Sequence, residues 1–174
     1  MVVAGVRAMK CSANEVMTLA AKAARGAGAP PAQAADFGTA ALRHLQAGRE
    51  VQNLTDALEH LPTGPILLLP LQLLRIAENT RDDVARGEFL RAECGGLAQS
   101  YLDAQPYETL MEKSGDSARV TLFLDKPKAT HISHRVFIPN SLVTLLQTYA
   151  ARMLVPETDA SRLSGAGAGL SDND

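Results

Sequence analysis

Short stretches of helical periodicity, each ended by glycine or proline, limit the fold of this chain more than any other feature. The first stretch begins with Ser12 and Glu15, whose spacing is that of a capping box at a helix start. Gly26 follows as the expected left-handed stop of the same helix. Between these ends the apolar residues share one helical face: Val16, Leu19, Ala20 and Ala23.

Two further helices are predicted in the opening third of the chain. One covers residues 31–48, with Pro31 in its first turn and Gly48 at its end. The other starts near Asn53 and is closed by Pro62. The residues expected to face a core have helical spacing in both: Phe37, Ala41 and Leu45, then Leu54, Ala57, Leu58 and Leu61. These segments predict a small helical cluster.

The middle of the chain admits two interpretations. Residues 64–76 can form a helix that contains Pro70, or residues 66–69 can form a buried strand. Residues 80–83 favour a capped short turn that ends at Gly87, and the alternation over residues 90–94 favours a strand that ends at Gly95.

Alternating residues later in the chain predict a hairpin. Residues 120–124 form one strand, and residues 130–138 form its partner after a turn at Pro127. Asn140 is the expected N-cap of a long C-terminal helix that ends before Pro156. We therefore expect one α+β domain over residues 1–174, with an N-terminal helical cluster, a small antiparallel sheet, a long C-terminal helix and a glycine-rich tail.

Charge and composition narrow the possible partners. The net charge is −2 and the basic residues are scattered, so we expect no nucleic-acid partner and no anionic membrane surface. The longest apolar run, residues 66–74, is interrupted by Pro70 and is far shorter than the ~20 residues of a membrane span. Cys11 and Cys94 have no paired spacing and are expected as two buried free thiols of a soluble, cytoplasmic protein.

The last twenty residues, Val155 to Asp174, are small, turn-forming and acidic. Gly165, Gly167 and Gly169 alternate with alanine, so an extended segment would present one face made only of hydrogen atoms. Such a face suits close packing against the protein or a second subunit, or contact with a ligand; a frayed tail is the third possibility. A dinucleotide loop is excluded because too few residues follow Gly169 to form its helix.

Two stretches, Ser12 to Gly28 and Val155 to Asp174, resemble the end signatures of an uncharacterised bacterial family, a domain of unknown function found largely in proteobacteria. The resemblance implies a full-length single-domain member and implies no particular reaction. Two departures affect the expected contacts: residues 31–36 lack the family's bulky aromatic, and Asp159 stands where a Glu is expected. Residues 12–48 are also faintly similar to the helical N-terminus of type-2 malate and lactate dehydrogenases.

Arg25 and Arg162 each lie beside one of the two end motifs, and Arg suits bidentate contacts with carboxylate or phosphate. One hypothesis is that the two motifs meet, with Arg25 and Arg162 facing a shared pocket for an anionic ligand. The alternative is that Arg162 pairs with Asp159 or Glu157 and only fixes the tail. The candidate ligand-binding residues are Arg25, Gly26, Arg162, Gly165, Gly167 and Gly169.

Other chemistry is less well supported by the sequence. His131 and His134 would point to opposite faces of a strand, and no third ligand accompanies them, so no metal site is expected there. The acidic end, Asp172 to Asp174, is expected to be solvated. Ser161 and Ser164 lack the setting of a nucleophile. His44 and His60 are expected at the surface.

These observations favour a binding or accessory protein for a small anionic ligand, with the tail at the site. An enzyme acting on organic acids is one alternative, suggested by the dehydrogenase likeness. A structural subunit whose tail docks on a partner or on a second copy, forming a homodimer, is the other. The sequence indicates no cofactor and no catalytic residue.

Overall fold

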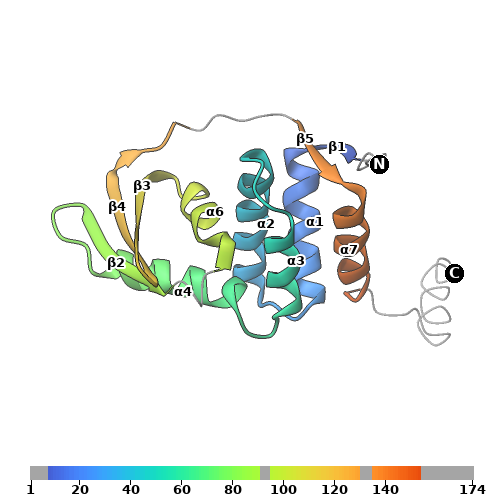
Figure 1. Cartoon of the computed structure of the whole chain (residues 1–174), viewed down its shortest axis with the longest axis horizontal. Helices are drawn as coiled ribbons and strands as arrows, with labels where there is room; N and C mark the ends of the chain where they lie inside the picture. The colour runs from blue at the N-terminus through green and yellow to red at the C-terminus, as the bar shows by residue number, and fades with distance from the viewer. Residues whose placement is uncertain (1–7, 91–94, 130–134, 154–174) are drawn as a thin grey trace, which may run out of the picture.

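The computed structural model describes residues 8–90, 95–129 and 135–153. Figure 1 shows a group of helices with a three-stranded sheet at one end and a two-stranded sheet at the other. Helices α1 (Ala13–Gly26), α2 (Pro31–Gln46) and α7 (Asn140–Ala151) lie side by side, with α1 in contact with both of the others. Helices α4 (Pro65–Glu78) and α6 (Ala98–Asp103) also pack on α2, and α3 (Gln52–Glu59) packs on α4. Strands and helices together confirm the mixed α+β class.

Helix α1 begins as the sequence predicts. Ser12 is its N-cap, and its Oγ accepts a hydrogen bond from the Glu15 amide at 3.2 Å. The Glu15 carboxylate accepts one in return from the Ser12 amide at 2.7 Å. The helix continues past the expected left-handed stop, because Gly26 is still helical and the positive φ of 108° belongs to Gly28. Both capping bonds compensate amides that the helix itself leaves unpaired.

Small residues let α1 approach two neighbours closely. A β-carbon at Gly38 of α2 would overlap the Met17 carbonyl, and one at Gly26 would overlap the Tyr149 carbonyl of α7. Ala20 and Ala23 of α1 are fully buried between these helices. The helices are therefore so close at these positions that no larger side chain fits between them, which agrees with the small number of large aromatic residues in the chain.

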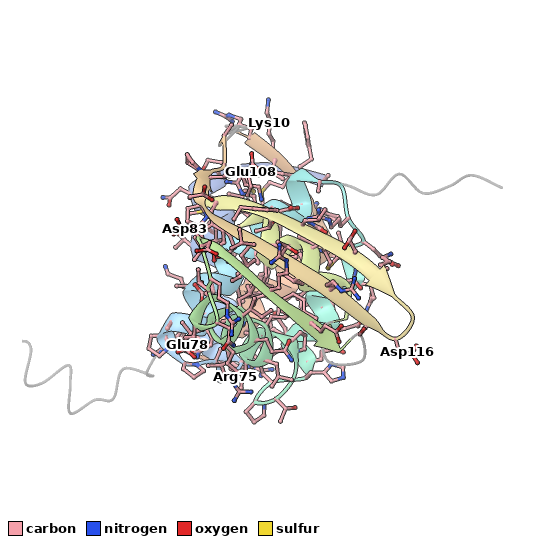
Figure 2. All side chains as sticks on the ribbon, turned by 90° about the vertical axis from the view of Figure 1, so that its left-hand side faces the viewer. Lys10, Arg75, Glu78, Asp83, Glu108 and Asp116 are labelled. Carbon is pink, nitrogen blue, oxygen red and sulfur yellow. The ribbon has the colours of Figure 1, made fainter. Side chains whose placement is uncertain are left out.

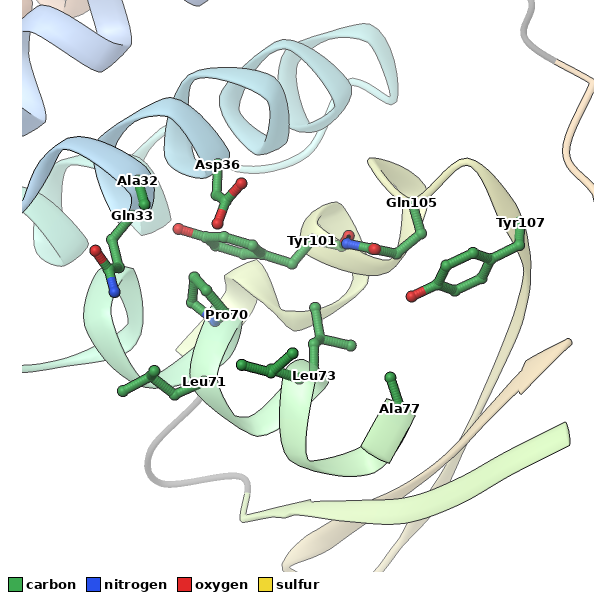
Figure 3. A pocket seen from close by; sticks show the side chains of 11 residues that line it. Ala32, Gln33, Asp36, Pro70, Leu71, Leu73, Ala77, Tyr101, Gln105 and Tyr107 are labelled. Carbon is green, nitrogen blue, oxygen red and sulfur yellow. Dashed lines mark hydrogen bonds between the residues drawn. The ribbon is translucent and has the colours of Figure 1, made fainter. Parts of the chain in front are cut away.

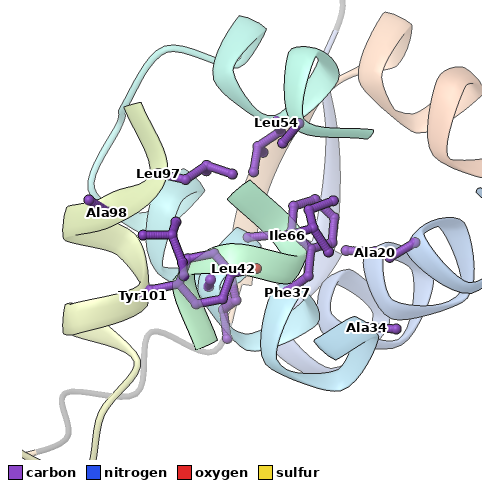
Figure 4. Packing of buried hydrophobic residues seen from close by; sticks show 14 of the residues in the cluster. Ala20, Ala34, Phe37, Leu42, Leu54, Ile66, Leu97, Ala98 and Tyr101 are labelled. Atoms are coloured by element: carbon purple, nitrogen blue, oxygen red, sulfur yellow. The ribbon is translucent and has the colours of Figure 1, made fainter. Parts of the chain in front are cut away.

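The ambiguous middle segment is helical, so the helix interpretation is confirmed. Helix α4 contains Pro70 and buries Ile66, Leu69, Leu73 and Ile76. Proline removes one backbone donor, yet the apolar contacts of the remaining helix hold it in place. Figure 4 shows Ile66 within the central cluster, together with Phe37 of α2 and Tyr101 of α6.

The three-stranded sheet has the order β2-β4-β3 and is antiparallel. Its strands are β2 (Val84–Leu90), β3 (Tyr107–Ser114) and β4 (Ser117–Pro127). The face toward α4 carries buried Phe89, Val120 and Leu122. Gly87 lies on that face as well, where a β-carbon would overlap the Ile76 side chain of α4. Figure 2 views the opposite face of this sheet, where Arg119 lies between Glu88 and Glu112 on the adjacent strands.

The predicted hairpin between residues 120–124 and 130–138 is wrong. The hairpin partner of β4 is β3, a strand for which the sequence analysis gives no prediction, and Gly115 with φ 56° lies in the turn between them. Strand β5 (Arg135–Pro139) instead pairs with β1 (Ala8–Ser12). Val136 and Ile138 are buried, which agrees with the alternation over residues 130–138. Alternation identifies the core face of a strand and leaves its partner strand open.

Three boundaries also differ from the sequence expectation. The turn at residues 80–83 is present, with φ of 50° and 61° at Asp82 and Asp83. It leads directly into β2, so Gly87 lies within a strand and does not end the turn. The strand expected over 90–94 begins earlier, and residues 91–94 lie outside the described part. Asn140 is the first residue of α7 and Pro139 precedes it as N-cap. The predicted start of α7 at Asn140 therefore differs from the observed start by one residue.

Candidate functional site

A pocket of about 350 Å³ opens between α2, α4, α6 and the start of β3. Figure 3 shows its polar side chains. Gln33 and Asp36 are on α2, Tyr101 is on α6, Gln105 lies between α6 and β3, and Tyr107 begins β3. Its volume falls within the range of sites for small molecules.

Tyr101 is the most unusual of these residues. Its side chain is 1% exposed and packs into the central cluster, where Figure 4 shows its ring near Leu42 and Leu97. Its hydroxyl has no hydrogen-bond partner, although it is fully buried. In Figure 3 that hydroxyl points toward the end of the pocket formed by Asp36 and Gln33. Buried hydroxyls without a partner are rare in proteins, and each calls for an explanation.

Asp36 is the charged group of the pocket. Its side chain remains accessible to solvent, yet the surrounding protein removes enough water to raise the pKa of the carboxyl. Burial, and after it the charge of Asp36, raises the pKa of Tyr101 well above its ordinary value. Tyr101 is therefore a neutral donor at physiological pH, and Asp36 places a carboxyl group near it.

The remaining wall is apolar and comes mainly from α4. Pro70, Leu73 and Ala77 lie inside it, as Figure 3 shows. Leu71 and Leu74 line it from positions that are 44% and 57% exposed. Large exposed leucines beside a concave surface are a common sign of a binding site for apolar groups.

A second group of polar side chains joins α2 to α6. His44, expected at the surface, is fully buried, so that prediction is wrong. Its Nε2 lies 2.7 Å from the Glu50 carbonyl, which can only accept, so Nε2 carries the proton and Nδ1 accepts from Ser100 at 2.9 Å. Arg49 donates to the same Ser100 hydroxyl at 3.1 Å and to the Asp103 carboxylate at 2.5 Å. His60 is exposed, as predicted.

The buried His44–Ser100 pair does not form a nucleophilic site. Both residues are 0% exposed, and neither is among the residues that line the pocket near Tyr101. Burial lowers the pKa of His44, which keeps the imidazole neutral. The pair therefore links α2 to α6 through satisfied hydrogen bonds and explains how a histidine and a serine can be buried together.

The residues that the sequence proposed as a ligand site are only partly within the described structure. Arg25 lies exposed in the last turn of α1, and Gly26 faces the backbone of α7 at Tyr149. Neither lines the pocket near Tyr101. Arg162 and the tail glycines, Gly165, Gly167 and Gly169, lie outside the described residues. The expected meeting of the two end motifs stays a prediction.

The other candidate metal-binding or reactive residues also lie partly within and partly outside the described structure. His131, His134, Ser161, Ser164 and Asp172 to Asp174 are outside the described residues, as is Cys94. Cys11 is a free thiol in β1 and is half-buried, so it is less enclosed than expected. Within residues 8–90, 95–129 and 135–153, no three His, Cys, Asp or Glu side chains group as metal ligands do. No helix of that part has the length and apolarity to cross a bilayer.

Sequence reasoning missed Tyr101 and Asp36, although one signal was available. The chain has three tyrosines and no tryptophan, and two of the three, Tyr101 and Tyr107, line this pocket. In a chain with so few polar aromatic residues, two tyrosines separated by a short segment with a Gln-Pro turn indicate a candidate binding site. The burial that makes Tyr101 unusual comes from α2 and α4, which are far away in sequence.

Comparison of the chain with family models, with curated proteins and with solved structures finds no match.

Proposed function

We propose that this protein binds a small, largely apolar molecule that carries a hydroxyl or carboxamide group, in the pocket next to Tyr101. The observation that carries the proposal is the buried Tyr101 hydroxyl with no hydrogen-bond partner. Leaving such a group unpaired costs about 1–3 kcal/mol. A ligand that accepts its hydrogen bond would recover much of that free energy on binding.

The two polar groups at this end of the pocket specify the kind of ligand. The Tyr101 hydroxyl has no acceptor for its proton, and the exposed Asp36 carboxylate can accept a hydrogen bond from a ligand. A hydroxyl or carboxamide supplies both, whereas an ammonium group supplies only donors. A carboxylate supplies only acceptors and is repelled by Asp36, and no Lys or Arg is among the residues that line the pocket. The rest of the ligand would contact Leu71, Leu73 and Pro70.

An anionic ligand at the tail is a separate hypothesis and rests on Arg25, Arg162 and the glycine motif. The pocket near Tyr101 gives it no support, because its charged residue is an acid. An enzyme acting on organic acids would also need a group that stabilises a carboxylate, and this pocket offers none among its lining residues. Docking of the tail on a second copy remains a further hypothesis about residues outside the described part.

A matched set of ligands tests the proposal. Cyclohexylmethanol, cyclohexanecarboxamide, cyclohexylmethylamine and cyclohexanecarboxylate share one apolar skeleton and differ in the polar group. We expect the alcohol and the amide to shift amide resonances of residues around Tyr101 in two-dimensional NMR and to raise the melting temperature. The amine and the carboxylate should bind at least tenfold more weakly, about 1.4 kcal/mol.

Two variants separate the site from general stability. Tyr101→Phe keeps the ring and removes the hydroxyl, so binding of the alcohol and amide should be lost. Tyr149→Phe removes a hydroxyl from α7, outside the pocket, and should leave binding unchanged. Equal binding of all four compounds, or unchanged binding to Tyr101→Phe, would show that Tyr101 does not select the ligand.

A further inference from the structure

Three cationic side chains from separate parts of the chain gather at the C-terminal end of α6. Arg43 is on α2, Arg49 follows that helix, and Lys128 follows β4. The Lys128 Nζ donates to the Leu102 carbonyl at 3.2 Å and lies 3.9 Å from the Asp103 carboxylate. Arg49 binds the same carboxylate at 2.5 Å. Chain segments far apart in sequence therefore bring their positive charges to one place.

The cluster contains more positive than negative charge. Asp103 is the carboxylate in contact with it, and one of its oxygens also accepts from Gln99 at 3.0 Å. Glu108 acts on Lys128 from farther away, with a weaker effect than either Arg43 or Arg49. Arg49 and Lys128 thus both contact the Asp103 carboxylate, whereas Arg43 contacts the neutral amide of Gln46.

Arg43 is the member of the cluster with the poorest compensation. Its Nη1 donates to the neutral Gln46 amide oxygen at 3.1 Å, and its Nε is buried with no acceptor. A partly buried guanidinium with an unsatisfied N–H is destabilising unless a negative charge lies near it. Partial burial lowers the pKa of Lys128, and the charges of Arg43 and Arg49 lower it further against the opposing effect of Asp103.

We propose that Arg43, Arg49 and Lys128 form a binding site for a doubly charged oxyanion, namely phosphate or the phosphoryl group of a larger molecule. Two guanidinium groups and an ammonium group are the side chains that proteins use most often for such anions. A bound oxyanion would supply the negative charge that Arg43 does not receive from the neutral Gln46 amide. Arg25 and Arg162, suggested by the sequence, take no part in this site.

The first test is the stability of the whole protein in phosphate and in chloride at equal ionic strength. Specific binding raises the melting temperature with phosphate concentration, beyond the effect of chloride. Phosphorus NMR of inorganic phosphate with the protein should show line broadening that sulfate reverses by competition. No difference between phosphate and chloride in the wild-type protein would overturn the proposal, whatever the variants do.

Single substitutions test whether phosphate binds at the Arg43–Arg49–Lys128 cluster. Arg43→Gln should weaken phosphate binding at least tenfold, while Arg75→Gln, which removes an exposed cation from α4, should leave it unchanged. If Arg43→Gln does not fold, Lys128→Gln serves the same purpose. Unchanged phosphate binding in a folded Arg43→Gln or Lys128→Gln variant would show that the anion binds elsewhere.

Phenyl phosphate distinguishes the two sources of the anion. Tighter binding of phenyl phosphate than of inorganic phosphate indicates a phosphoryl group on a larger molecule, and equal binding indicates the free ion. Tyr101→Phe should keep the full response to inorganic phosphate, because Tyr101 is not part of the cluster. The oxyanion site and the pocket near Tyr101 can therefore fail independently.

Discussion

The buried hydroxyl of Tyr101 lacks a hydrogen bond at the position where the proposed ligand would supply one. A tyrosine placed in the core for packing alone would be replaced by phenylalanine without loss, since its hydroxyl contacts no acceptor. The hydroxyl therefore does not contribute to the stability of the fold, and the proposed ligand binding gives it a role. This is the pattern expected of a residue kept for recognition at some expense in stability.

We expect Tyr101→Phe to raise the free energy of unfolding by about 1 kcal/mol in the absence of ligand, because it removes a buried unpaired hydroxyl. Urea unfolding followed by circular dichroism measures the change. Tyr149→Phe, at a half-buried position of α7, should change it by less than ~0.5 kcal/mol. A clear loss of stability in Tyr101→Phe would mean that the hydroxyl has a structural partner.

His44 makes stability depend on pH. Burial lowers the pKa of its imidazole, opposed by its hydrogen bond to the Glu50 carbonyl, and the charge of Arg49 lowers it further. The unfolded chain thus takes up a proton near pH 6.5, before the folded protein does. The contribution of His44 is complete above about pH 6.5 and is lost as the pH falls from there toward the folded pKa.

This dependence can be isolated by urea unfolding over roughly pH 5 to 7.5. Asp36, whose pKa is raised, acts in the opposite direction, so the series is best run in an Asp36→Asn background. Adding His60→Gln should leave the slope unchanged because that histidine is exposed. Titration of the His44 ring signals by NMR gives the folded pKa directly, and a value above 6.5 would contradict the prediction.

At the scale of elements, close approach between helices depends on single glycines. Gly26→Ala places a methyl group on the Tyr149 carbonyl, and because that neighbour is backbone, α1 and α7 must move apart. We expect a loss of about 1–3 kcal/mol in the free energy of unfolding. Thr18→Ala, on the exposed face of α1, should change it by less than ~0.5 kcal/mol. Equal stability of both variants would mean that the two helices are not in close contact.

The contact between α4 and the sheet allows a double-variant test. Gly87→Ala meets the side chain of Ile76, which can be shortened, whereas the Gly26 clash involves backbone. Gly87→Ala should therefore be destabilising in the native chain and much less so in an Ile76→Ala background. A coupling of roughly 1 kcal/mol or more between the two positions is expected from thermal unfolding. Additive effects would contradict the packing of β2 on α4.

Local signals were sufficient for elements that form from nearby residues. The capping box at Ser12, proline at the start of α2 and helical spacing in α3 predicted those helices closely. Strand pairing depends on residues far apart, so the partner of β4 was predicted wrongly and β1 was missed. The candidate site was missed for the same reason, since Asp36 and Tyr101 become neighbours only when α2 packs on α6.

At the scale of the whole molecule, the two sheets should differ in local stability. Strand β4 is central in its sheet and contributes fully buried side chains. Among the described residues β1 has β5 as its one partner strand, and its own residues are half-buried or exposed. Two-stranded sheets are marginal by themselves. We expect β1 amides to exchange with solvent much faster than β4 amides in hydrogen-exchange experiments. Equal protection in both strands would indicate that β1 is held as firmly as the core.

The pairing of β1 with β5 also has a consequence for how the protein is made. The register joins Ala8 to Pro139, so about 130 residues are synthesised between one strand and its partner. At about 5–20 residues per second the ribosome takes on the order of 10 s to cover that distance. Throughout that time residues 8–12, Met9 and Cys11 among them, lack the strand with which they pair, so this sheet can form only after residues 135–139 have left the ribosome.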